Sequence, residues 1–138
     1  MKRTRVGLAV LLVSLIIYLL TLPRDVLPGD SGELIAASRT LSIAHPPGYP
    51  LYLLIGNIFS RVFAFGSIAL RYNLLSAVAV SLMMVLLWKV LSDLVAPIVA
   101  GLVPLVIATL GSTWLQATTA EVYAFNGLIT VGLLLLSL

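Results

Sequence analysis

The sequence predicts an all-α polytopic membrane protein. Of its 138 residues, 61% are hydrophobic and only 9% are charged. A soluble domain of this size cannot bury so large an apolar fraction, so the bilayer is the expected solvent for much of the surface. The apolar runs are separated by shorter polar segments that contain proline and glycine, which is typical of helices joined by loops. The chain has no cysteine, which excludes disulfides and thiolate metal sites.

The first expected membrane span covers residues 6–22. It follows three basic residues in the opening MKRTR segment, a pattern shared by signal peptides and uncleaved first helices. Pro23 and Arg24 come next and no small-x-small cleavage site is present, so we expect an uncleaved helix. The positive-inside rule then places the N-terminus in the cytoplasm.

Residues 23–72 are expected to form an external loop with two helices on the membrane surface. A short helix is predicted over 31–40, between two groups of prolines. The second, 51–65, contains Asn57 and Arg61 and as a helix extends about 22 Å, too short to cross the bilayer. An arginine at the bilayer centre costs at least ~2.5 kcal/mol, which favours a juxtamembrane helix. The alternative is that 51–65 spans the membrane and reverses every later segment.

Three further spans are predicted at 73–91, 97–114 and 122–138. Lys89 can extend from the end of the first of these to the cytoplasmic interface. The last run stays apolar up to Leu138, so we expect the chain to be the front part of a longer protein. This arrangement places the candidate acids and the histidine together on the external side of the membrane: Asp30, Glu33, His45 and Glu121.

Asp30 and Glu33 are the first candidates for chemistry. Their spacing at a predicted helix start matches a capping box, in which both side chains accept backbone N–H groups. The same spacing suits a general base, because a carboxylate at the membrane surface can take a proton from an acceptor hydroxyl. The residues alone leave both interpretations open.

Other polar residues have both a structural and a functional interpretation. His45 begins the rigid segment HPPGYP; it is either part of a stiff turn or a group for phosphate binding or proton transfer. Glu121 either caps the last helix or joins a shared acidic site. Arg24, Arg39 and Arg61 suit an anionic lipid phosphate or ordinary headgroup contacts.

Several functional classes are excluded or not predicted. The basic residues are dispersed, which argues against nucleic-acid binding. The sequence has no zinc-type histidine pair, P-loop or dinucleotide-binding glycine motif, so no cofactor is predicted. No metal site is predicted either, although the use of a divalent metal is left open.

Three segments carry a family resemblance: LPGDSGELIAASRTLSIAHPPGYPLYLLIGNIF, RYNLLSAV and WLQATTAEVYAFN. They resemble the N-terminal part of a bacterial protein O-mannosyltransferase-like domain-of-unknown-function family that has an animal O-mannosyltransferase relative. That family is similar to the GT-C glycosyltransferases, multi-helix membrane enzymes with juxtamembrane helices in the first external loop. PGDSGEL and HPPGYP are the specific elements, and the match covers almost the whole chain.

The resemblance implies an inverting glycosyltransferase in the plasma (inner) membrane of a bacterium. It would move a sugar, expected to be mannose, from a polyprenyl-phosphate donor lipid to a hydroxyl of a protein or glycan acceptor. Asp30 matches the general base of the first external loop, Glu33 is the second candidate, and Glu121 matches the acid of the second. For substrate binding we expect His45, Glu121, Arg39 and Tyr49. The alternative is a membrane transporter or scaffold subunit, in which the acids are structural or ion-coupling.

Overall fold

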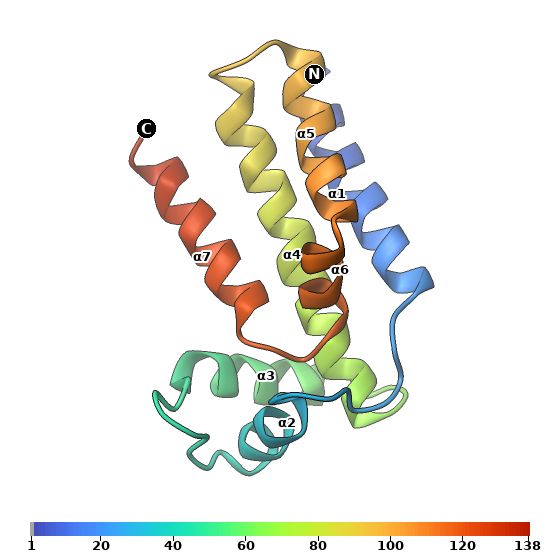
Figure 1. Cartoon of the computed structure of the whole chain (residues 1–138), viewed down its shortest axis with the longest axis vertical. Helices are drawn as coiled ribbons and strands as arrows, with labels where there is room; N and C mark the ends of the chain where they lie inside the picture. Colours follow the sequence, from blue (N-terminus) through green and yellow to red (C-terminus); the bar gives the residue numbers. More distant parts are fainter. Residues whose placement is uncertain (1) are drawn as a thin grey trace.

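The computed structural model describes residues 2–138, with side chains from residue 4, and this range contains seven helices and no strand (Figure 1). The all-helical prediction is therefore confirmed for the described range. The helices are α1 Lys2–Leu20, α2 Ser31–Thr40, α3 Pro50–Val62, α4 Ile68–Ser92, α5 Pro97–Thr109, α6 Gly111–Thr118 and α7 Tyr123–Leu136.

Helices α1, α4, α5 and α7 form an upright bundle together with the short α6, and α2 and α3 close one end of it. α4 is central and contacts α1, α5 and α7, while α2 and α3 pack together across the end where α1 finishes (Figure 1). We call this end the base: α2, α3 and the loops 21–30, 41–49, 63–67 and 119–122. The start of α1, the end of α7 and the α4–α5 loop lie at the opposite end of the bundle. α3 lies across the base rather than alongside the upright helices.

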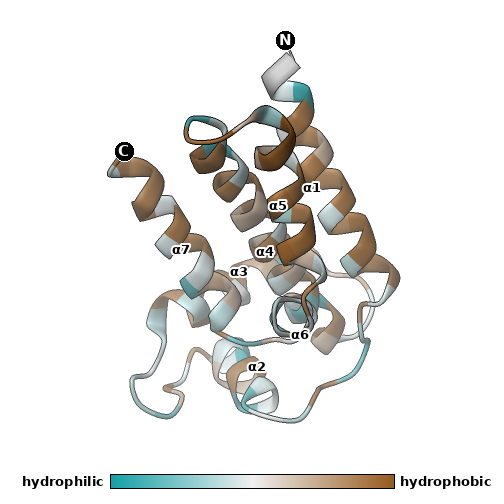
Figure 2. Cartoon of the chain, turned by 45° about the horizontal axis from the view of Figure 1, so that its top comes forward, coloured by the Kyte–Doolittle hydropathy of each residue, from teal (hydrophilic) through white to brown (hydrophobic). Residues whose placement is uncertain are grey.

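The bundle is held together by apolar packing against α4. Val80, Met84 and Trp88 of α4 are buried in a core shared with α1, α5, α6 and α7. Small residues allow the backbones to approach closely, as in membrane bundles. At Gly7, for example, a Cβ atom would lie 2.6 Å from the Trp88 ring, so only glycine fits without a shift of the indole. Figure 2 shows that the upright helices are mainly hydrophobic, whereas the base is much more polar.

α4 is the one described helix that is by itself long and apolar enough to cross a membrane. α5 and α6 together meet the same criterion as a pair bent by 70°. Two shorter apolar helices, over Thr4–Leu20 and Tyr123–Leu136, flank them in the bundle. Four membrane spans and a cytoplasmic N-terminus thus remain predictions.

The segment expected as one span over 97–114 is broken at Leu110. Leu110 has extended backbone angles, φ −65° and ψ 138°, which end α5 at Thr109 and start α6 at Gly111. The break removes the helical donor for the carbonyl of Ala108, and the hydroxyl of Tyr18 on α1 donates to that oxygen instead, at 2.9 Å. A buried carbonyl left unpaired is costly, so this bond supports the break.

The other helix bounds lie within a few residues of the expected ranges, and α4 differs most. It begins five residues before the expected start at 73, because the hydroxyl of Ser67 accepts the backbone N–H of Leu70 at 3.1 Å and caps the helix. α2 covers Ser31–Thr40, against an expected 31–40, and α3 covers Pro50–Val62, against 51–65.

A carboxylate and histidine cluster at the base

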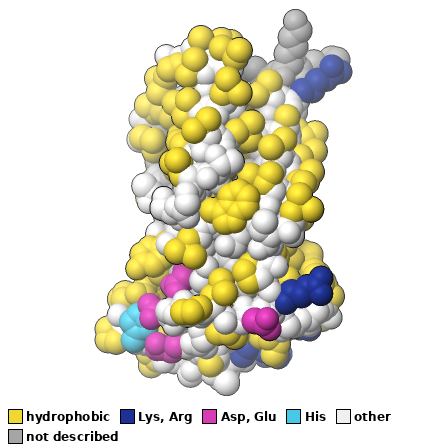
Figure 3. Space-filling model, turned by 45° about the vertical axis from the view of Figure 1, so that its right-hand side comes forward, with side chains coloured by type: hydrophobic (Ala, Val, Ile, Leu, Met, Phe, Trp, Pro, Cys, Tyr) yellow, Lys and Arg dark blue, Asp and Glu magenta, His cyan; other side chains and the backbone are white. Residues whose placement is uncertain are grey.

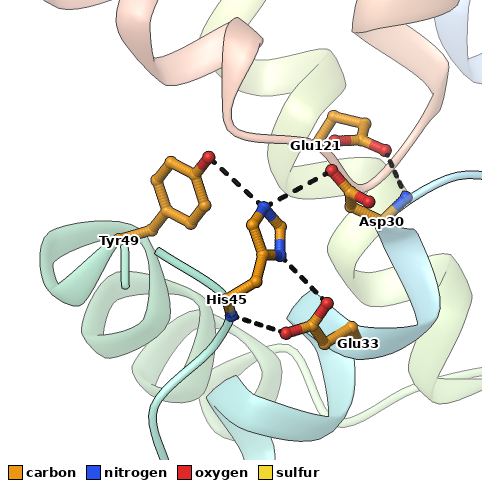
Figure 4. Close-up of polar contacts among 5 residues, drawn as sticks. All are labelled: Asp30, Glu33, His45, Tyr49 and Glu121. Carbon is orange, nitrogen blue, oxygen red and sulfur yellow. Dashed lines mark hydrogen bonds and ion pairs between the residues drawn. The ribbon is translucent and has the colours of Figure 1, made fainter. Parts of the chain in front are cut away.

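Five polar side chains from three separate segments meet at the base: Asp30, Glu33, His45, Tyr49 and Glu121 (Figure 4). The two acids come from the N-terminal turn of α2, His45 and Tyr49 come from the 41–49 loop, and Glu121 comes from the loop between α6 and α7. We call these five residues the cluster. Figure 3 shows the histidine and acidic side chains gathered on one side of the base, below the apolar bundle.

Glu33 holds His45 through both of its oxygens. Oε1 accepts the backbone N–H of His45 at 2.6 Å, and Oε2 lies 2.9 Å from the ring Nδ1. Because an ionised carboxylate only accepts hydrogen bonds, Nδ1 must carry the proton. The neutral imidazole therefore presents the lone pair of Nε2 to the rest of the cluster.

The capping box suggested by the sequence is not formed. Asp30 occupies the N-cap position of α2, but its side chain makes no capping hydrogen bond. Its backbone N–H, which Glu33 would accept in a capping box, donates instead to Glu121 Oε1 at 3.1 Å. Glu121 does not cap α7 either, since the N-cap position there is Val122 and no side chain caps it. Glu121 thus ties the α6–α7 loop to the start of α2.

The Asp30 carboxylate faces His45 from the side opposite Glu33. Its Oδ2 lies 3.7 Å from His45 Nε2, and its side chain is 54% exposed. The hydroxyl of Tyr49 lies 3.5 Å from the same ring nitrogen, and the two rings meet edge to face. Asp30 is only slightly more exposed than Glu33, whose side chain is 48% exposed, and Glu121 is partly buried.

The pKa values of the cluster follow from these contacts. The hydrogen bond to Glu33 is the largest cause that raises the pKa of His45, and the charges of the nearby acids add to it. The pKa of Glu33 is lowered, first by the backbone N–H of His45 and then by its ring. Burial raises the pKa of Glu121, partly offset by the N–H of Asp30.

Three cluster residues have the composition of a divalent metal site. Asp30, Glu33 and His45 each offer one ligand atom, and these atoms lie within 4.8 Å of one another. Carboxylate oxygens with one imidazole suit ions such as Mn²⁺ or Zn²⁺. However, Glu33 and Nδ1 of His45 already bind each other, so an ion would have to compete with that pair.

Arg39 lies outside the cluster. It is in the last turn of α2, and its Nη1 is 3.5 Å from the hydroxyl of Ser60 on α3. The other predicted site residues, Asp30, Glu33, His45, Tyr49 and Glu121, are brought together. The role of each of them stays a prediction.

Polar contacts that the sequence does not predict hold α2 against α3. Asn57, expected as a polar residue of a surface helix, is buried, and its Nδ2 donates to Ser38 O at 2.7 Å. The hydroxyl of Tyr72 on α4 donates to the Ser38 hydroxyl at 2.8 Å. One signal was present in the sequence: Asn57 lies four residues after Leu53, on the same face of α3, and both are buried.

The fold and the cluster thus define a helical protein with an acid–histidine site at the polar end of an apolar bundle. Residues 30–138 match the family model described as the protein O-mannosyl-transferase TMEM260 N-terminal domain. The match covers most of the chain, including the whole cluster, and the chain belongs to this family.

Two relatives carry the same description in their names. The chain is 42% identical to the mouse protein O-mannosyl-transferase TMEM260 over 123 residues, 86% of this chain. It is 29% identical to the Dictyostelium discoideum protein O-mannosyl-transferase over 141 aligned positions, 99% of the chain. The chain spans 17% of the length of each relative. No solved structure gives a significant match.

Proposed function

We propose that the chain contributes the acidic site of a membrane protein O-mannosyltransferase of the GT-C type. In this proposal the enzyme moves mannose from a polyprenyl-phosphate donor to a hydroxyl group of a protein, on the external face of a membrane. Family membership and the names of the two relatives support a glycosyltransferase that acts on proteins. The lipid donor, the inverting mechanism, the GT-C fold, the bacterial inner membrane and the external location are the parts that go beyond those names.

The position of the cluster supports a reaction at the membrane surface. A polyprenyl chain must stay in lipid while a protein acceptor arrives from water, so the site must lie at the boundary between the two. The base is polar and the adjoining bundle is apolar, and the cluster lies where they meet (Figures 2 and 3). This is the boundary that such a transfer requires.

The observation that carries the proposal is the unequal engagement of the two α2 carboxylates. Both oxygens of Glu33 are occupied by His45, whereas the Asp30 carboxylate has only the 3.7 Å contact with Nε2. A general base must present a free lone pair to the incoming hydroxyl. Asp30 is therefore the proposed base, and Glu33 is a positioning residue.

The proposed step is a single displacement. The acceptor oxygen attacks C1 of the sugar while its proton passes to Asp30. The bond from C1 to the phosphate oxygen breaks, and the phosphate leaves with the electron pair, which inverts the configuration at C1. His45 Nε2 can receive the proton from Asp30, since Glu33 stabilises the resulting imidazolium as a carboxylate does in hydrolase triads.

The remaining cluster residues position the base and the acceptor. Glu121 holds the backbone of Asp30, and Tyr49 places a hydroxyl beside His45 Nε2, where the acceptor would enter. Arg39 is directed to Ser60 and has no part in this proposal.

A transporter or scaffold is supported less well. Ion coupling by charged groups requires such groups within the spans, but the buried polar side chains in the described parts of α1 and α4 are neutral: Ser14, Asn73, Ser76 and Ser81. In the described chain the acids lie in the base, apart from Asp93 at the other end of α4.

The test compares matched substitutions in the full-length protein, assayed for mannose transfer from a polyprenyl-phosphate donor. Asp30→Asn keeps the size of the side chain and should lower kcat by roughly 10² or more, because it removes the base. Asp25→Asn, which removes an exposed acid of the same loop, should leave the rate unchanged. Near-normal transfer by Asp30→Asn, with loss of transfer in Glu33→Gln, would assign the role of general base to Glu33. Equal rates of transfer in all three variants would show that these carboxylates do not form the active site.

A further inference from the structure

A groove of about 690 Å³ opens between the end of α1 and the start of α4, away from the cluster. One wall is formed by Leu19, Leu20 and Leu22, and the other by Phe65, Leu70 and Leu74. Leu20 is 79% exposed and Phe65 is 51% exposed, so the apolar lining is largely uncovered. The volume lies within the range of small-ligand sites. No cluster residue lines the groove.

Arg24 stands at the polar rim of this groove and has a fixed backbone. The Ser67 hydroxyl, which also caps α4, donates to the carbonyl of Arg24. On either side, Asn73 Nδ2 donates to Pro23 O at 3.0 Å and to Asp25 O at 3.3 Å. The turn that carries Arg24 is thus held against α4 at three successive residues.

Arg24 and Arg71 differ in what their guanidinium groups do. Arg71 donates to the carbonyls of Phe65, Gly66 and Ser60 at 3.0 to 3.1 Å and so builds the loop that forms one wall. The guanidinium of Arg24 makes no hydrogen bond or ion pair within the described residues 2–138. It is the cation at the groove that is free to bind a ligand.

We infer that this groove binds one anionic phospholipid, with the phosphate on Arg24 and an acyl chain between the leucines of α1 and α4. A guanidinium matches a phosphate by paired hydrogen bonds, and the apolar walls continue directly from it toward the bundle. An anionic headgroup complements the charge of Arg24, whereas the choline of phosphatidylcholine adds a second cation. The ligand is a bound membrane lipid and not the sugar donor. The inference rests on the proposed membrane location, but not on the transferase activity.

The experiment measures lipid retention by native mass spectrometry of the full-length protein. The protein is extracted from nanodiscs of phosphatidylcholine mixed with phosphatidylglycerol and washed in detergent. The wild type should retain one phosphatidylglycerol in preference to phosphatidylcholine. Arg24→Gln should lower this retention several-fold, whereas Arg61→Gln, which removes a charge from the same base outside the groove, should not.

A second variant tests the groove itself. Leu20→Trp places a large ring at a highly exposed position, so the fold can accommodate it while the groove fills, and retention should fall although Arg24 is intact. Unchanged retention in either Arg24→Gln or Leu20→Trp would overturn the proposal, as would equal retention of both lipids by the wild type. Loss of donor affinity in Arg24→Gln, with phosphatidylglycerol retention unchanged, would assign the groove to the donor instead. Mannose transfer is read separately, so failure of one proposal does not decide the other.

Discussion

Glu33 and His45 form a two-point contact between α2 and the 41–49 loop: one carboxylate accepts both the backbone N–H and the ring Nδ1–H of the same histidine. The two residues are twelve positions apart, so the contact closes the loop against the start of α2. It also sets the imidazole tautomer and directs Nε2 toward Asp30. One side chain thereby anchors the loop and orients the ring.

Glu33→Gln tests this double role. Glutamine keeps the length of the side chain and can still accept one bond from His45, but it loses the charge and the second acceptor. We expect the pKa of His45 to fall toward its ordinary value of 6.5 and amide exchange in the 41–49 loop to become faster. Hydrogen–deuterium exchange mass spectrometry of the full-length protein measures the second effect, with Asp25→Asn as the control. Unchanged exchange in Glu33→Gln would show that the contact does not anchor the loop.

The same pair predicts how order in the loop depends on pH. The pKa of Glu33 is lowered in the folded protein. The contribution of Glu33 to the stability of the loop is therefore complete above the ordinary pKa of 4.5, and it is lost as the pH falls through the folded pKa. The pKa of His45 is raised in the folded protein. The contribution of its positive charge to the stability of the loop is therefore complete below the ordinary pKa of 6.5, and it is lost as the pH rises through the folded pKa. Protection of residues 41–49, corrected for intrinsic exchange, should peak between about 4.5 and 6.5. A neutral ring keeps both hydrogen bonds, so the loss at high pH should be partial. If protection of residues 41–49 in the wild type did not change with pH, the contact between Glu33 and His45 would not be what orders the loop.

The sequence predicted the helices well where composition alone decides them. Prolines at 28, 46, 47 and 50 separate the apolar runs and mark where α2 and α3 begin or end. The break at Leu110 was not predicted, and the contact that supports it comes from the hydroxyl of Tyr18, ninety-two residues earlier in the chain. Gly111, directly after the break, is a local sign of it.

The members of the candidate site could be chosen from the sequence, but their partners could not. A capping box is a local pattern, and the spacing of Asp30 and Glu33 fits it. In the structure two contacts with distant segments take the place of the capping box. Glu33 accepts the backbone N–H of His45, and Glu121 accepts the backbone N–H of Asp30. Such contacts depend on the path of the loops, which residue spacing does not encode.

Gly56→Ala should destabilise the packing of α3 against α2 and α4. A Cβ at Gly56 would lie 2.6 Å from the Tyr72 ring and 2.9 Å from the Ser38 hydroxyl. These two side chains are hydrogen-bonded to each other, so neither can easily move away. Overpacking of this kind typically costs 1–3 kcal/mol, roughly, and should lower the unfolding temperature of the full-length protein.

Gly132→Ala in α7 is the matched control. The nearest atom to a Cβ added at Gly132 would be Leu86 Cδ1 at 3.7 Å, an ordinary contact. Alanine is also more stable than glycine in a helix by roughly 0.5–1 kcal/mol. The control should therefore be neutral or slightly stabilising. Equal unfolding temperatures for the two variants would show that Gly56 is not closely packed.

The last prediction concerns membrane topology. If α3 lies on the surface, the 41–49 loop and the start of α7 face one side of the membrane, and the α4–α5 loop faces the other. If 51–65 crosses instead, the 41–49 loop and the start of α7 face opposite sides. The hydrogen bond from Asp30 N to Glu121 Oε1 requires the first arrangement, since it joins the start of α2 to the loop that precedes α7.

The count of basic residues does not decide the orientation, because four lie toward each end of the bundle. Lys2, Arg3 and Arg5 at the start of α1 and Lys89 near the end of α4 are at one end. Arg24, Arg39 and Arg61 are in the base, and Arg71 is in the first turn of α4 next to it. The prediction that the base is external therefore rests on the first helix, whose flanking charges usually dominate.

Single cysteines at three exposed positions test this orientation in intact cells, in a full-length protein without other cysteines: Ser42, Leu94 and Tyr123. An impermeant thiol reagent should label the cysteines at 42 and 123 directly, and the one at 94 only after permeabilisation. Labelling of 94 alone would keep the fold but reverse its orientation, whereas opposite results at 42 and 123 would mean that 51–65 crosses the membrane and that the cluster cannot assemble.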